Sequence, residues 1–267
     1  MVASEGSANP TGRLRGRRIL IVGAGQQDHG IEEPPIGNGR AMAVAFAREG
    51  AALALADIDS ASLEATLELV RAEGAACVGV VADAAEESGI EEMFERGIAA
   101  LGGLDGLVMN VGVGAGFGLR ATSVEDWDRV LATNLRSHFL GCRRALADVQ
   151  PGGAVVLIGS LAGRETMPIP SYAASKAALE ALCRSAAVEG APELRVNVLA
   201  PGLIDTSLGR LATKLSPARG EVRIPAGRQG SAWEVARCAL FLIGDDSSYV
   251  TGQTLVADGG LSVAMRS

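Results

Sequence analysis

The feature that most constrains the fold of this chain is an alternation of short apolar runs with longer amphipathic stretches. The runs are mostly apolar at consecutive positions rather than at every second residue, with exceptions such as Arg18, Arg195 and Asn197, and they occupy 18–22, 52–56, 77–81, 106–109, 154–158, 195–199 and 254–257. Continuous apolar runs are typical of parallel strands that are covered on both faces. The stretches between them favour helices at 39–49, 60–73, 87–101, 123–147, 171–189 and 231–243. This pattern predicts an α/β fold, a doubly wound parallel sheet of the Rossmann type with about seven strands and with helices on both faces.

Length and charge agree with one domain of this class. A chain of 267 residues fits a single α/β domain, so we expect one domain at 18–267 behind a flexible arm at 1–17. The chain has 24 Lys+Arg against 31 Asp+Glu and no dense basic patch, which argues against nucleic acid or an anionic membrane as its main partner.

No apolar stretch approaches the roughly 18–20 residues that cross a bilayer, and the first eighteen residues hold no apolar signal segment. The four cysteines are widely spaced and have no neighbouring histidine. This usage predicts reduced thiols, no metal site and a cytoplasmic location.

A glycine-rich turn follows the first predicted strand. Gly23 and Gly25 end that strand, and Gly37 and Gly39 open the next helix. Glycines at such a turn let the backbone approach a pyrophosphate, which then lies on the amides of a helix N-terminus. Asp57 ends the following strand, with no basic residue beside it in the sequence. A carboxylate at that place accepts the hydroxyls of an adenosine ribose and repels a 2′-phosphate, so we expect NAD rather than NADP.

Residues 26–36 lengthen this turn. We expect the loop to fold outward, because Asp28, Glu32 and Glu33 would repel a bound pyrophosphate at close range. It is either a surface loop without a functional role or a lid over the cofactor.

A tyrosine and a lysine lie four residues apart at the start of the helix predicted at 171–189. Tyr172 and Lys176 share one face of that helix, and a nearby ammonium would lower the pKa of the phenol. A phenol tuned in this way can act as a general acid or base near neutral pH. Ser160 ends the fifth predicted strand, where its hydroxyl could hydrogen-bond a substrate carbonyl. Neither of the two histidines, His29 and His138, stands in a position to make Ser160 a nucleophile, so a hydrolase is not expected.

Taken in order, these motifs resemble the short-chain dehydrogenases/reductases from about Gly16 to Ser262. The resemblance rests on the glycine-rich turn, Asp57, Asp83 after the third strand, Asn110 and Gly112 after the fourth, Asn134, Ser160, Tyr172, Lys176, the segment Pro201 to Thr206, and the C-terminal Thr251-Gly252-Gln253 and Asp258-Gly259-Gly260. Two departures stand out: Val22 replaces the usual Thr, and the turn is about ten residues longer than is common.

The resemblance implies a role for each matching position. Tyr172 would donate or accept the proton at the substrate oxygen, and Lys176 would lower its pKa while holding the nicotinamide ribose. Ser160 would orient the substrate carbonyl, and Asn134 would hold a water that links Lys176 to solvent. The cofactor would be contacted by Gly23, Gly25, Gly37, Gly39, Asp57, Asp83, Asn110, Gly112, Tyr172, Lys176, Pro201, Gly202, Ile204 and Thr206.

The sequence therefore predicts an NAD-dependent oxidoreductase that interconverts a secondary alcohol and a ketone. Two alternatives stay open: an NADP-linked 3-oxoacyl or polyketide-type ketoreductase, and a dinucleotide-binding regulator without catalysis.

The segment 203–227 resembles the mobile substrate lid of the family. With Val113, Phe117 and Leu119 it predicts a largely apolar pocket. Arg120, Arg164 and Arg210 are candidates to bind an acidic substrate group. By analogy with the family, helices 123–147 and 171–189 predict a homotetramer, or a homodimer.

Overall fold

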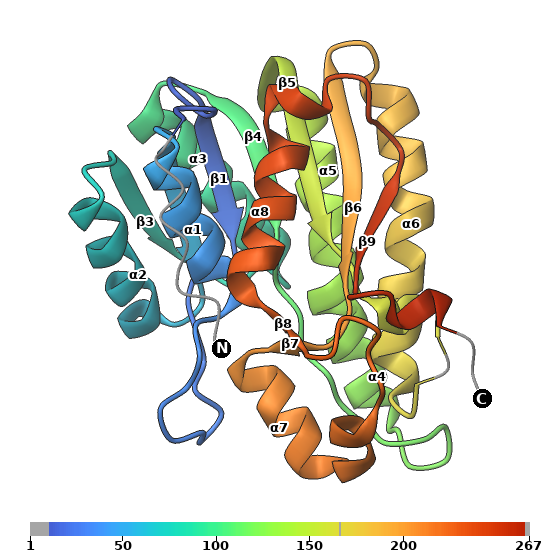
Figure 1. Cartoon of the computed structure of the whole chain (residues 1–267). Helices are drawn as coiled ribbons and strands as arrows, with labels where there is room; N and C mark the ends of the chain where they lie inside the picture. Colours follow the sequence, from blue (N-terminus) through green and yellow to red (C-terminus); the bar gives the residue numbers. More distant parts are fainter. Residues whose placement is uncertain (1–10, 166, 265–267) are drawn as a thin grey trace.

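A computed structural model describes residues 11–165 and 167–264, and its centre is a seven-stranded parallel sheet (Figure 1). The strands run in the order β3-β2-β1-β4-β5-β6-β9. Their bounds are β1 Arg18–Val22, β2 Ala52–Asp57, β3 Cys77–Val81, β4 Leu104–Met109, β5 Val149–Ile158, β6 Leu194–Pro201 and β9 Thr254–Ala257. The predicted fold class is confirmed. The chain order reverses between β1 and β4, and in sheets of this kind ligands bind beyond the carboxyl ends of the strands at such a switch point.

Helices cover both faces of the sheet, each with its own apolar core. On one face lie α1 (Asn38–Arg48), α2 (Ser60–Ala72) and α8 (Ala232–Ile243), and on the other α3 (Glu87–Leu101), α5 (Ser137–Asp148) and α6 (Pro170–Gly190). Because alternate residues of each strand point to opposite faces, β1 contributes Ile19 and Ile21 to the first core and Leu20 and Val22 to the second. This double burial explains why β1 is apolar at each of the positions 19–22.

Two predicted elements differ from the structure. The helix expected at 123–147 consists of α4 (Val124–Leu131), a π-helical turn η1 (Ala132–Arg136) and α5. Of the arm expected at 1–17, residues 1–10 lie outside the described residues, and residues 11–17 pack on the domain. Leu14 is fully buried, and the Glu49 carboxylate accepts hydrogen bonds from the backbone amides of Thr11 and Arg13. The flexible arm therefore does not extend to residue 17.

The predicted lid is a small unit below the carboxyl ends of the strands (Figure 1). It contains β7 (Ile204–Asp205), α7 (Ser207–Leu215) and a 3-10 turn η3 (Pro217–Glu221), and β7 pairs in parallel with β8 (Gly230–Ser231). Thr206 caps α7, because its side chain accepts a hydrogen bond from the Gly209 amide at 3.1 Å.

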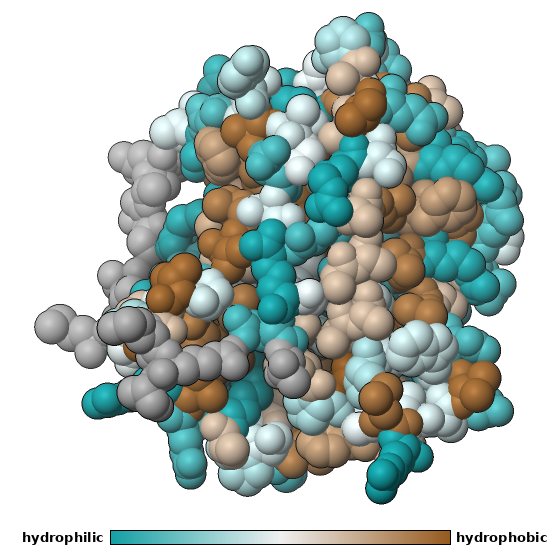
Figure 2. Space-filling model, turned by 90° about the vertical axis from the view of Figure 1, so that its right-hand side faces the viewer, coloured by the Kyte–Doolittle hydropathy of each residue, from teal (hydrophilic) through white to brown (hydrophobic). Residues whose placement is uncertain are grey.

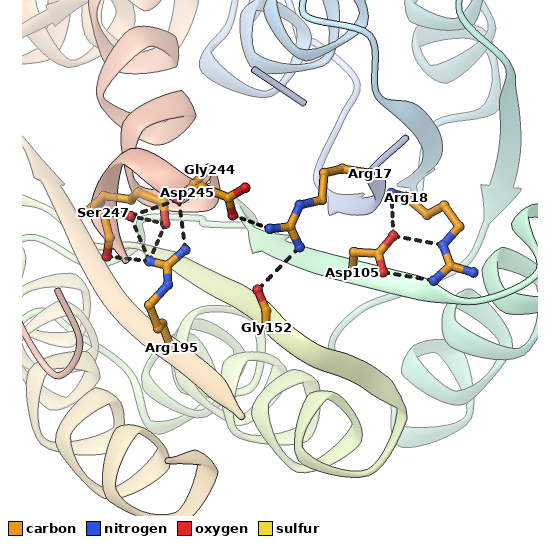
Figure 3. A network of polar contacts seen from close by, with 9 residues as sticks. Arg17, Arg18, Asp105, Gly152, Arg195, Gly244, Asp245 and Ser247 are labelled. Carbon is orange, nitrogen blue, oxygen red and sulfur yellow. Dashed lines mark hydrogen bonds and ion pairs between the residues drawn. The ribbon is translucent and has the colours of Figure 1, made fainter. Parts of the chain in front are cut away.

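A network of arginines ties the strands together at the opposite end of the sheet (Figure 3). Arg18 of β1 forms two hydrogen bonds of 2.8 Å with the Asp105 carboxylate of β4. Arg195 of β6 donates to the carbonyl oxygens of Leu242, Gly244 and Ser247, which closes the C-terminal end of α8. These guanidinium groups stabilise the scaffold far from the ligand-binding edge.

The face that carries β9 and α6 mixes hydrophobic and hydrophilic side chains (Figure 2). Among the exposed large hydrophobic residues of the described chain are Phe139 on α5 and Val188 on α6.

No helix within residues 11–165 and 167–264 is both long and apolar enough to span a membrane.

Candidate active site

A cleft of about 640 Å³ opens at the switch point between β1 and β4, which is a volume typical of small-molecule and cofactor sites. It brings together nine of the predicted cofactor residues, namely Gly23, Gly25, Gly37, Gly39, Asp57, Asp83, Asn110, Gly112 and Thr206. These residues come from the ends of β1, β2, β3 and β4, from the start of α1 and from the N-terminus of α7.

The glycine turn is built for close packing of backbone on backbone. A Cβ atom at Gly39 would lie 2.0 Å from the Gly23 carbonyl oxygen, so α1 can approach the end of β1 only with glycine there. Gly23 has φ +83°, a conformation that side chains rarely adopt. The Asn110 side chain donates a 2.7 Å hydrogen bond to the Gly23 carbonyl oxygen and so ties the turn to β4, although Val22 offers no hydroxyl for this purpose. The turn therefore fits a dinucleotide pyrophosphate.

The Asp57 carboxylate is held at the rim of the cleft. It accepts hydrogen bonds from the backbone amides of Gly25 at 2.8 Å and Asp59 at 3.1 Å. Arg40 on α1 interacts with it electrostatically, a neighbour that the sequence around Asp57 does not reveal. The Arg40 guanidinium is engaged elsewhere, because it donates to the Thr66 hydroxyl and the Ser62 carbonyl. Asp57 remains an oriented hydrogen-bond acceptor that faces the cleft.

The loop 26–36 exposes its acidic side chains and also contacts the N-terminus of α1. Its acidic side chains, Asp28, Glu32 and Glu33, are exposed as expected, whereas His29 lines the cleft. The Gln26 side-chain oxygen accepts a hydrogen bond of 2.8 Å from the Gly37 amide, at the N-terminus of α1. This amide is one of the donors that an anion at the helix N-terminus would use, so Gln26 occupies a position that a pyrophosphate oxygen can take.

Lys176 lies in the interior beside the cleft. It is only 4% exposed, and its ammonium donates a 2.8 Å hydrogen bond to the Ile158 carbonyl oxygen at the end of β5. Its Nζ lies 5.9 Å from the centre of the Tyr172 ring, one helical turn earlier. A Cβ atom at Gly112 would lie 3.4 Å from the same nitrogen, which places Lys176 directly behind the cleft wall. Tyr172 and Lys176 are not among the residues that line the cleft, and Lys176 adjoins it through Gly112.

Asn134 is fully buried in the π-helical turn η1. Its side chain accepts from the Val113 amide at 2.8 Å, and it donates to the Val113 carbonyl at 2.9 Å and to the Ser175 hydroxyl at 3.1 Å. It therefore joins the segment after β4 to α6, one residue from Lys176. A π-helical turn often marks a functional position, and here it brings the amide side chain into the site.

Burial has the largest effect on the pKa values of Tyr172 and Lys176. It raises the pKa of Tyr172, against the hydrogen bond from Ser160 and the charge of Arg219, which both lower it. Burial also lowers the pKa of Lys176 to about 8. The expectation that Lys176 depresses the phenol pKa is thus not met in this structure, because the phenol is desolvated and the ammonium is bound to Ile158.

Ser160 and the lid complete the surroundings of Tyr172. Ser160 caps the turn after β5, where its hydroxyl accepts a hydrogen bond from the Ala162 amide at 3.2 Å. Arg219 of η3 carries the charge that interacts with Tyr172. Sequence reasoning did not select Arg219, because nothing in its sequence neighbourhood distinguishes it from the other arginines.

Other predicted residues lie away from the cleft. Pro201, Gly202 and Ile204 are not part of its lining, and Ile204 is 7% exposed within a core. The predicted apolar substrate pocket is not closed, since Phe117 and Leu119 are 60% and 81% exposed.

Two of the three arginines predicted for an acidic substrate are already paired. Arg164 binds Glu180, and Arg210 binds Asp205 through two hydrogen bonds. Arg120 is exposed. None of the three therefore offers a buried, unpaired charge to the site.

The chain is similar to known oxidoreductases over most of its length. A family model described as enoyl-(acyl carrier protein) reductase matches residues 36–262. An inactive 2-(S)-hydroxypropyl-CoM dehydrogenase of Xanthobacter autotrophicus is 38% identical over 83% of this chain and 99% of its own length. The 3beta-hydroxysteroid dehydrogenase 1 of Eggerthella lenta is 32% identical over 94% of this chain and 95% of its own length.

The fold is shared with solved structures as well. The crystal structure of levodione reductase superposes with a TM-score of 0.85 at 32% sequence identity, covering 94% of this chain and 99% of that one. With the ordered motifs, the cleft and these matches, the chain belongs to the short-chain dehydrogenase/reductase family, whose members are dinucleotide-linked oxidoreductases of alcohols and ketones.

Proposed function

We propose that this protein is an NAD-dependent dehydrogenase/reductase that interconverts a secondary alcohol and a ketone, with Tyr172 as the general acid and base. The observation that carries the proposal is the position of Lys176, which is buried next to Tyr172 and lies against Gly112 of the dinucleotide cleft. A structural lysine is rarely buried without a carboxylate partner. Its placement here is accounted for by a role in the reaction.

The side chains divide the chemistry among them. Bound NAD supplies the hydride acceptor and its reduced form the hydride donor. Tyr172 takes the proton from the alcohol oxygen during oxidation and returns it to the carbonyl oxygen during reduction. Ser160 donates a hydrogen bond to the same oxygen and stabilises the charge that develops on it.

Lys176 and Asn134 support Tyr172 from behind. The ammonium of Lys176 would hold the nicotinamide ribose and favour the ionised phenol when the ribose closes the site over it. Asn134 would keep the segment after β4 at a fixed distance from α6 and hold a water through which Lys176 exchanges protons with solvent.

The residues around the cleft would hold the dinucleotide. The amides of the glycine turn would bind the pyrophosphate once the Gln26 side chain leaves the Gly37 amide, and Asp83, Asn110 and Thr206 would contact the remainder. Asp57 would accept the adenosine ribose hydroxyls, and its charge disfavours the 2′-phosphate of NADP. We include Pro201, Gly202 and Ile204 among the cofactor-binding residues only for their backbone atoms, because this segment leads from β6 into the lid.

One observation favours an NADP-linked ketoreductase as the second candidate. Arg40 lies close enough to Asp57 to interact with its charge, and a guanidinium is the group that accommodates a 2′-phosphate. For that purpose Arg40 would have to give up its bonds to Ser62 and Thr66. We therefore place NAD first.

The experiment compares the two cofactors with a panel of secondary alcohols and follows the absorbance of the reduced nicotinamide. We expect turnover with NAD, a smaller kcat/KM with NADP, and a shift of that preference toward NADP in Asp57→Ala. Tyr172→Phe should retain NAD binding in calorimetry and lose about 10²-fold or more in kcat. A Tyr172→Phe variant with full activity would overturn the mechanism, and NAD binding without turnover of any substrate would favour a non-catalytic regulator.

We further propose that the protein acts as a homotetramer in the cytoplasm. The exposed Phe139 and Val188 lie on the helices that would form the contacts, and the four cysteines are free thiols. Light scattering coupled to gel filtration measures the oligomeric state directly.

A further inference from the structure

The lid carries a half-buried arginine, Arg219, that forms no ion pair within residues 11–165 and 167–264. Two neighbouring arginines differ from it. Arg210 is paired with Asp205, and Arg228 is paired with Glu234, each through two hydrogen bonds. Arg219 thus stands apart as a partly buried charge without a carboxylate partner in the described structure.

Hydrogen bonds fix the place of the Arg219 guanidinium. Its Nη1 donates to the Gly209 carbonyl oxygen at 2.9 Å and to the Thr213 hydroxyl at 2.6 Å. Both acceptors belong to α7, whose first residues, together with Thr206, line the dinucleotide cleft. The guanidinium therefore lies against the helix whose N-terminus borders the cleft.

The charge of Arg219 affects the proposed general acid and base, Tyr172. It interacts with Tyr172 and lowers the pKa of that phenol, while burial lowers the pKa of Arg219 itself. Arg219 of the lid and Tyr172 of α6 therefore lie near enough for the charge of one to shift the pKa of the other.

The remaining donors of Arg219 have no acceptor among the described residues. Nη1 is used, whereas Nε and Nη2 make no hydrogen bond in that part of the chain. A guanidinium in this state presents the fork that binds carboxylate and other oxyanions with two parallel hydrogen bonds. Removing a cation from water without a partner costs free energy, which an incoming anion would offset.

We propose that Arg219 binds an oxyanion of the substrate next to the carbon that Tyr172 serves, so that the substrate is a hydroxy or oxo acid rather than a neutral alcohol or ketone. This inference rests on the proposed function and narrows its substrate class. It also replaces the expectation of a largely apolar pocket with one that has a single anchoring charge.

The test compares acids with their neutral methyl esters. Short- and medium-chain 2-hydroxy and 3-hydroxy acids, each beside its ester, are offered to the enzyme with NAD. For the preferred carbon skeleton we expect kcat/KM to be at least about 10-fold higher for the acid, which corresponds to one charged hydrogen-bonding contact.

Variants separate recognition of the anion from the catalytic chemistry. Arg219→Met should lower the ratio of kcat/KM for the acid to kcat/KM for the ester by about 10- to 100-fold, because any effect through the pKa of Tyr172 is common to both substrates. Arg219→Lys should restore part of that ratio. Arg223→Met, which removes an exposed arginine from the same segment, is the matched control and should behave as the unmodified protein.

A binding measurement makes the outcome independent of turnover. Acetoacetate and methyl acetoacetate are titrated into the protein with oxidised NAD, a combination that cannot react. Tighter binding of the acid that is lost in Arg219→Met supports the proposal.

Equal losses for acid and ester in Arg219→Met, or a preference of the unmodified protein for the ester, would overturn it. Full activity of Tyr172→Phe would refute the mechanism while leaving the Arg219 result intact, so the two failures are distinguishable.

Discussion

Replacing Lys176 with methionine should make the folded protein more stable at neutral pH while removing its activity. Lys176 is 4% exposed, its only hydrogen bond in the described structure goes to the Ile158 carbonyl, and burial lowers its pKa from 10.5 to about 8. A shift of that size means that the charged form costs about 3 kcal/mol in the folded state. Methionine has a similar length and removes this cost.

The net gain is smaller because the Ile158 carbonyl loses its donor. Such a loss costs about 1 kcal/mol, which leaves a gain of about 2 kcal/mol at pH 7. The pH dependence follows from linkage. Between the folded pKa of about 8 and the unfolded value of 10.5, the unfolded chain binds more protons, so the stability of the unmodified protein rises with pH. The advantage of the variant is therefore complete below pH 8 and disappears toward pH 10.

Urea unfolding at fixed protein concentration, followed by circular dichroism from about pH 6.5 to about pH 9.5, measures this difference. Lys214→Met is the matched control, because Lys214 is the only other lysine and is exposed; its stability should match that of the unmodified protein at every pH. A Lys176→Met variant that is less stable at pH 7, or a difference that does not change with pH, would refute the reasoning.

Three further perturbations address the turn, the phenol and the scaffold. Gly39→Ala should weaken NAD binding at least about 10-fold in calorimetry, because its Cβ would lie 2.0 Å from the Gly23 carbonyl oxygen, whereas Gly114→Ala, with nothing within 4 Å, should bind normally. Because burial raises the pKa of Tyr172 and Ser160 lowers it, kcat/KM for alcohol oxidation should increase with pH through the alkaline range, and Ser160→Ala should move that increase to higher pH; a flat profile would contradict this assignment. Arg195→Met should lower the free energy of unfolding by about 2–4 kcal/mol, since it leaves the carbonyl oxygens at the end of α8 without their donor. The kcat of this variant at a low temperature should stay unchanged. A variant as stable as the unmodified protein would contradict the role given to this network.

The sheet could be predicted from the sequence because its signal is local. Strands such as β1 and β2 lie where the continuous apolar runs placed them, since burial on both faces favours apolar residues at consecutive positions. The carboxyl ends of β2 and β4 then place Asp57 and Asn110 at one edge of the sheet without further information.

The irregular parts were not accessible in this way. The helical pattern at 123–147 continues through the π-helical turn η1, because one extra residue in a turn hardly disturbs the apolar spacing. Yet this turn is what carries Asn134 into contact with Val113 and Ser175. Similarly, a tyrosine and a lysine four residues apart predict a shared helix face, but their burial, which raises one pKa and lowers the other, depends on strands and loops distant in the sequence.

Arg219 shows where sequence reasoning about charge ends. All arginines carry the same charge in the sequence, and a functional one differs from a structural one by its burial and its counter-ion. Arg164 is neutralised by Glu180, 16 residues away on α6, and Arg210 by Asp205 across the first turn of α7. Arg219 turns inward instead and donates to α7. Because tertiary packing decides which arginine meets a carboxylate, the substrate charge can be inferred only once every pair in the lid has been assigned.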